Sequence, residues 1–166
     1  MGSIKVNVRD FMKKYATSEY RHGIYIPSDI NSQLTRAYIT GKDFITLRDT
    51  VLEEIEANKR AQDERDELYN LISQYRLTGM ELEKVDMQGA IEQYKQCIAV
   101  GEKTNMFHAF AHAYERIIVL LHKAKDYESE RNYIVAYLKH DLTEAVRTKY
   151  QQRLTKLADK WIKTIY

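Results

Sequence analysis

The chain has 166 residues, of which 44% are hydrophobic and 30% are charged, and its formal net charge is +2. This composition is typical of a soluble globular domain and excludes a disordered chain, while a pI near 8.5 is too mild to favour nucleic acid as a partner. The one cysteine, Cys97, excludes an internal disulfide and a multi-cysteine zinc site. No apolar run reaches the ~18 residues of a membrane span and no leader opens the chain, so we expect a cytoplasmic protein without membrane contact.

The first predicted helix begins after Asn7, a good N-cap residue, and continues to Tyr15. Arg21–Gly23 ends it, and Ile24–Ile26 is predicted to be a short extended bridge, because Pro27 disfavours helix in the residues before it.

A second helix is capped by Ser28 or Asp29, and Gly41 supplies the left-handed turn that ends it. Asp43 is then predicted to cap a third helix that runs to Ile55. The polar stretch 58–66 fits either a connection or an exposed part of a long helix.

Further along the chain, apolar residues recur at helical spacing in five segments. These segments are 68–82, 90–99, 107–121, 127–138 and 142–161. Turns are predicted at 84–86, 104–105 and 125–126, so the segments between 68 and 138 form two helical hairpins.

Three aspartates precede helices with the same apolar spacing: Asp43, Asp86 and Asp126. They are separated by 43 and 40 residues, the scale at which helical repeats recur. A generic helical bundle is the alternative, because aspartate-capped amphipathic helices arise without repeats.

Several segments resemble the tetratricopeptide repeat, a pair of antiparallel helices. The resemblance spans 28–139 and rests on three groups of residues: Leu34, Tyr38, Gly41 and Phe44; Gly79, Asp86, Ala90, Tyr94 and Cys97; Tyr114, Ile117, Leu121, Asp126 and Tyr127. Ile118 and Glu130 depart from it, because the family has small residues at these two places.

The resemblance implies an all-α fold, an α-solenoid of about three helical hairpins. We predict an N-terminal helix and bridge in 1–27, hairpins in 28–141 and a capping helix in 142–166. Six bases and two acids in 143–166 leave open whether this last helix is a cap or a detachable basic arm.

The same resemblance implies a non-catalytic scaffold or adaptor that binds a protein or peptide and needs no cofactor. Binding residues of the family lie on the first helix of each hairpin, and the bases among them suit an acidic segment. Carried over to this chain, they are Arg36, Arg76, His112, Glu115 and His122. A homo-oligomer is compatible with the sequence.

Two motifs suggest chemistry. His108, His112 and Glu115 share one helix face and have the residue types of a metal site, although histidines of the core or surface explain them better. Arg116 and His122 have the spacing found in HEPN ribonucleases, an all-helical family, but they lie about 120° apart around a helix. We therefore expect no metal and no enzyme, and keep the ribonuclease as an alternative.

Residues 33–47 have the glycine and alanine spacing of a DNA-binding helix-turn-helix, which makes a nucleic-acid-binding regulatory module a further alternative. Arg36, Thr40 and Lys42 argue against it, because that motif packs apolar side chains at these positions.

Overall fold

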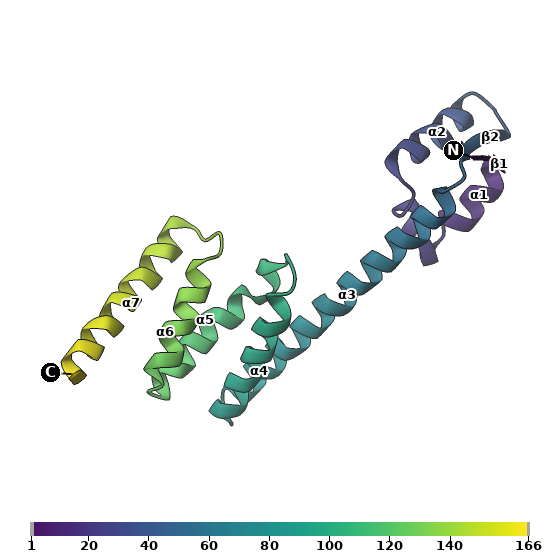
Figure 1. The fold of residues 1–166 in the computed structure, drawn as a ribbon. Coiled ribbons are helices and arrows are strands. Elements are labelled where there is room, and N and C mark those ends of the chain that lie inside the picture. The colour runs from purple at the N-terminus through teal and green to yellow at the C-terminus, as the bar shows by residue number, and fades with distance from the viewer. Residues whose placement is uncertain (1, 166) are drawn as a thin grey trace. The chain divides into compact units, whose positions relative to one another are not determined.

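The computed structural model describes residues 2–165, and the chain divides into two compact units, Met1–Asp66 and Glu67–Tyr166 (Figure 1). Helices make up most of both units, and one two-stranded sheet is the β-structure of the described part of the chain. The all-α class is confirmed at this level. Within residues 2–165, no helix is both long enough and apolar enough to cross a membrane.

The first unit begins with strand β1 (Ser3–Asn7) and helix α1 (Val8–Tyr15). A short 3-10 helix, η1 (Ser18–Gly23), and helix α2 (Ser28–Ile39) follow. The Asn7 side chain accepts a hydrogen bond from the Asp10 amide at 3.0 Å, which confirms the predicted cap. Gly41 has a φ of +70°, as the turn after α2 requires.

The predicted helix headed by Asp43 is wrong at its start, because strand β2 (Phe44–Arg48) lies there. β2 pairs antiparallel with β1, from Ser3 opposite Arg48 to Asn7 opposite Phe44. Leu47 is buried and its neighbours in sequence are less so, the alternation of a strand with one covered face. The carbonyl of Asp43 accepts a hydrogen bond from the Val8 amide, so this aspartate joins the sheet to α1 and does not cap a helix.

One hydrophobic core holds the first unit together. It combines side chains from α1, α2, β2 and the start of helix α3 (Val51–Leu82). Its members are Val8, Phe11, Tyr15, Tyr20, Tyr25, Ile26, Ile30, Leu34, Ala37, Leu47, Val51 and Ile55. The segments 1–27 and 28–57 therefore share one core.

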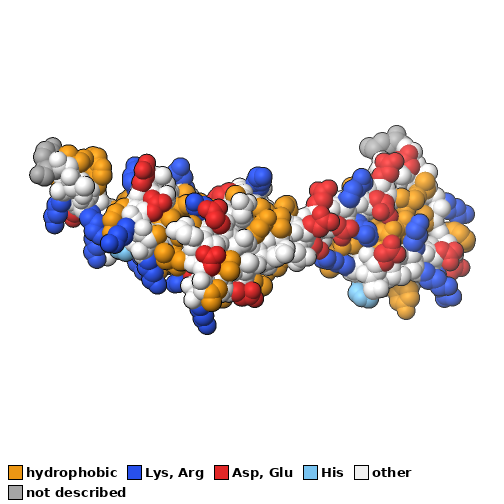
Figure 2. Space-filling view, turned by 90° about the horizontal axis from the view of Figure 1, so that it is seen from below, with side chains coloured by type: hydrophobic (Ala, Val, Ile, Leu, Met, Phe, Trp, Pro, Cys, Tyr) orange, Lys and Arg blue, Asp and Glu red, His pale blue; other side chains and the backbone are white. Residues whose placement is uncertain are grey.

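Helix α3 is continuous through the polar stretch 58–66, so this stretch is part of a long helix and not a connection. Lys59 pairs with Asp63 one turn later, at 3.2 Å, and such pairs suit an exposed helix surface. Acidic side chains gather around the middle of α3 in Figure 2, consistent with the eight acids in residues 49–67.

The second unit contains the end of α3 and four further helices. These are α4 (Met87–Gly101), α5 (Phe107–Lys123), α6 (Tyr127–Leu138) and α7 (Glu144–Ile165). α5 packs on α4, α6 on α5 and α7 on α6, in chain order (Figure 1). Asp86 and Asp126 cap α4 and α6 through the amides of Gly89 and Ser129, as their spacing predicted.

Two glycines let neighbouring helices of this unit approach closely. A Cβ on Gly79 would lie 2.8 Å from Cε1 of Tyr94, and a Cβ on Gly101 would lie 2.4 Å from Cδ1 of Phe110. A larger side chain at Gly79 would therefore require Tyr94 or the helices to move.

Helix α7 covers the last hairpin with part of its predicted stripe. Tyr150 and Leu157 are buried, and Leu142, Val146 and Leu154 pack half-buried against the same core. Trp161 was predicted to join them, but 66% of its surface is exposed.

Candidate functional site

The predicted binding residues are divided between the two units. Arg36 lies on α2 in the first unit, whereas Arg76, His112, Glu115 and His122 lie on α3 and α5 in the second. A site within one unit can therefore hold at most the last four.

A polar cluster lies where the end of α3 meets α4 and α5. The Nε of Arg116 donates to Oε1 of Glu83 at 2.8 Å, and the ring of Tyr94 meets that of His112 edge to face, with centroids 6.5 Å apart. Burial and the Glu83 carboxylate raise the pKa of Tyr94 to about 12. Arg116 and Glu83 thus bind each other, whereas the buried hydroxyl of Tyr94 has no hydrogen-bond partner among the described residues.

His112 carries a buried Nδ1 atom without a hydrogen-bond partner among the described residues. Burial lowers the pKa of His112, and the positive charges of Arg76 and Arg116 lower it further. His112 is therefore held in its neutral form, which suits packing rather than the binding of an anion.

Glu115 is engaged inside the second unit as well. Its Oε1 accepts a hydrogen bond from the hydroxyl of Tyr137 on α6 at 3.0 Å. Burial raises the pKa of Tyr137, and this hydrogen bond raises it further. No group of three His, Cys, Asp or Glu side chains suited to a metal ion occurs within residues 2–165.

Arg116 and His122, the pair with ribonuclease spacing, bind different carboxylates. Arg116 pairs with Glu83, whereas Nδ1 of His122 lies 2.9 Å from Oε2 of Glu130. Each side chain thus has its own partner from a different segment of the chain.

Glu130 is the centre of the best-defined charged site. Its side chain is fully buried, and its Oε1 accepts a hydrogen bond from Nε of Arg153 on α7 at 2.8 Å. His122 and Arg153 together approach both of its carboxylate oxygens. A buried carboxylate of this kind needs such partners, because burial of an unpaired charge is costly.

A basic depression of about 420 Å³ surrounds this carboxylate, between α7 and the adjoining ends of α5 and α6. Its cations on α7 are spaced by four, three and four residues, which puts them on one helix face. They are Lys149, Arg153, Lys156 and Lys160. Figure 2 shows Lys and Arg side chains gathered at the α7 end of this unit.

Most cations of this depression are uncompensated. Glu130 is the one carboxylate among the residues that line the depression. Within residues 2–165, Lys149, Lys156 and Lys160 form no ion pair with it or with any other carboxylate. These lysines are among the bases counted in the last predicted helix, but the sequence did not assign them to a site. The spacing along α7 was the signal that could have found them.

Comparisons with protein-family models, with curated proteins and with solved structures found no match. The site therefore has to be interpreted from its own geometry and charge.

Proposed function

We propose that the second unit is a non-catalytic scaffold built from two tetratricopeptide-like hairpins, α3–α4 and α5–α6, and closed by α7. Three features support this proposal. The caps at Asp86 and Asp126 recur after 40 residues, and each helix from α4 on packs on the next one along the chain, as in solenoids. The close approach of Gly79 to Tyr94 fits a hairpin of this type.

The surface that would bind a partner is the basic depression beside Glu130. The observation that carries this proposal is the set of lysines on one face of α7 that have no carboxylate partner, Lys149, Lys156 and Lys160, two of which lie over tyrosine rings. Their ammonium groups can pair with carboxylates of a partner, while Glu130 already has Arg153 and His122. The expected ligand is an acidic segment of another protein.

A charge-reversal experiment tests this function. The variant Lys149→Glu/Lys156→Glu and the full wild-type chain are used as baits in extracts of the source cells at 0.1 M and 0.5 M salt. The control Lys103→Glu/Lys139→Glu changes the net charge equally, at two exposed positions outside the depression. We expect to recover acidic proteins with the wild type and with the control at low salt. The α7 variant should not retain these proteins.

Equal loss from both variants would mean that net charge, not this depression, retains the partners. Partners that stay bound to the α7 variant would mean that another surface carries the function. Either result rejects the proposed site.

A further inference from the structure

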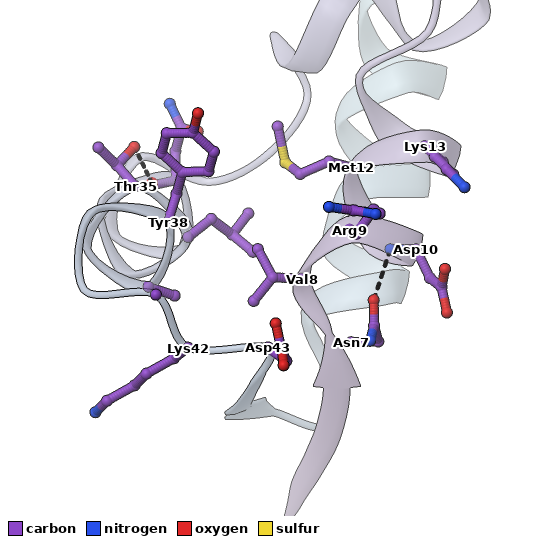
Figure 3. Close-up of a pocket in the computed structure, with 14 residues that line it drawn as sticks. Asn7, Val8, Arg9, Asp10, Met12, Lys13, Thr35, Tyr38, Lys42 and Asp43 are labelled. Carbon is purple, nitrogen blue, oxygen red and sulfur yellow. Dashed lines mark hydrogen bonds between the residues drawn. The ribbon is translucent and has the colours of Figure 1, made fainter.

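A depression of about 950 Å³ lies between α1, α2 and the turn that leads to β2 (Figure 3). Val8, Leu34 and Ala37 contribute apolar surface to it, and these three side chains also belong to the core of the unit. Arg9 and Lys13 line it from α1, and Lys42 from the turn.

The bases around this depression are uncompensated, unlike others in the same unit. Arg21 pairs with Asp66, and Arg48 pairs with Asp29 and Glu54. By contrast, four exposed bases have no ion pair within the described part of the chain. These are Arg9, Lys13, Arg36 and Lys42.

The positive surface continues past the depression on the other side of α2. A smaller hollow, lined by Gln33, Arg36, Thr40, Lys42 and Thr46 among others, contains no carboxylate. It shares Lys42 with the larger depression, whose own lining includes the two carboxylates of Asp10 and Asp43. The bases therefore outnumber the acids over the combined surface.

An exposed aromatic ring accompanies these bases. Tyr38 is 83% exposed, the highest value of any large hydrophobic side chain described, and Figure 3 shows its ring beside Met12 at the mouth of the depression. Phe44 is 52% exposed, with the Lys5 ammonium 4.9 Å from its ring centroid. A ring left in water can stack on a planar ligand, because both of its faces are accessible.

We propose that the surface formed by these two adjoining hollows binds single-stranded nucleic acid. Tyr38 stacks on a base, and Arg9 and Lys42 contact phosphates in the larger depression. Arg36 contacts phosphates on the other side of α2, past the shared Lys42. Stacking platforms flanked by bases are the usual means of holding single strands without sequence preference. A helix-turn-helix mode is less suited, because β2 occupies the place of the helix that would follow Gly41.

This proposal gives a new role to residues that weakened the DNA-binding interpretation of the sequence. Arg36, Thr40 and Lys42 were incompatible with the packed interior of a helix-turn-helix. All three are exposed in the structure, so they are available to a ligand.

Fluorescence anisotropy with the full chain tests the proposal, using labelled 20-nucleotide single strands of DNA and RNA and the matching duplex. We expect the single strands to bind more tightly than the duplex, with affinity that falls steeply between 50 and 200 mM salt. Tyr38→Ala should weaken single-strand binding about tenfold, and Arg36→Gln/Lys42→Gln should weaken it and flatten its salt dependence.

Two controls separate this face from other exposed groups. Val85→Ala removes an equally exposed apolar side chain, and Lys103→Gln/Lys139→Gln removes the same charge from two exposed positions outside the basic depressions. Binding that is unchanged in Tyr38→Ala, is equal for duplex and single strand, or is lost in Lys103→Gln/Lys139→Gln would overturn the proposal, as would no binding at 50 mM salt. Circular dichroism confirms that each variant is folded.

Discussion

Arg153 donates a hydrogen bond at 2.8 Å to Glu130, a carboxylate with no exposed surface. Glu130 departs from the tetratricopeptide resemblance, because that pattern has a small residue at this place. In the structure Arg153 supplies the opposite charge and His122 a further polar contact, so α7 is tied to α6 through Glu130.

The variant Arg153→Ala should lower the free energy of unfolding by about 3 kcal/mol, because it leaves Glu130 buried with His122 alone. Urea denaturation followed by circular dichroism at pH 7 measures this loss. The exposed neighbour Lys156→Ala is the control, and we expect a change within about 0.5 kcal/mol. Adding Glu130→Ala to Arg153→Ala should recover part of the loss, and a further decrease would contradict this account.

The variant Gly79→Ala should destabilise the protein by roughly 1–3 kcal/mol, although alanine is the better helix former. The new methyl group would lie 2.8 Å from Cε1 of the fully buried Tyr94, so the helices must move apart or the ring must shift. Thermal melts compare it with Glu81→Ala, an exposed substitution two residues later on α3. A Gly79→Ala protein that melts higher than the wild type would mean that the contact is not tight.

Helix α7 packs on the core of the second unit as far along as Leu157, whereas its tip is exposed. Tyr150→Ala should cost about 3 kcal/mol, because the ring is buried and meets Tyr137 edge to face with centroids 4.9 Å apart. Trp161→Ala should cost much less, because this side chain is mostly in water.

Deletion of 142–166 should cause aggregation or loss of cooperative unfolding. A truncated protein that melts like the full chain would instead identify α7 as a detachable arm.

Stability should depend on His112 between pH 7.5 and 5.5. The folded state lowers the pKa of this histidine below its ordinary value of 6.5, so folding favours the neutral ring. The lowered pKa of His112 therefore makes its full contribution to the free energy of unfolding above pH 6.5. This contribution is lost as the pH falls through the pKa of the folded state. The advantage of the wild type over His112→Gln in urea denaturation should therefore shrink on acidification. A constant difference would show that the ring is not held neutral.

The second unit could be predicted closely, because its signals are local. Asp86 and Asp126 cap helices through amides three residues away, and the apolar spacing that follows each of them is helical. The first unit could not be predicted as closely, because strand β2 forms only through its pairing with β1, about 40 residues earlier in the chain. Leu47 and Val51 are four residues apart, which also fits one helix face, so the pattern alone does not distinguish the two structures.

The binding residues expected on α2, α3 and α5 stay a prediction, and so does the acidic ligand. The surface that we propose lies on α7 and keeps only His122 from that set. The side chains of His112 and Glu115 are occupied by packing and by Tyr137, which no spacing rule reveals. The role of Glu130 depends on Arg153, 23 residues away, and a contact of this length leaves no periodic trace.

The pairing of β1 with β2 also bears on how fast each part of the chain folds. Ser3 meets Arg48 across 45 residues, so the first unit has to close a long loop before its sheet forms. The helices of the second unit pack on their immediate successors and need only short loops. Refolding from urea should accordingly proceed in two phases, with amide protection appearing in α4–α6 before it appears in the hydrogen-bonded pair Val6 and Ile45.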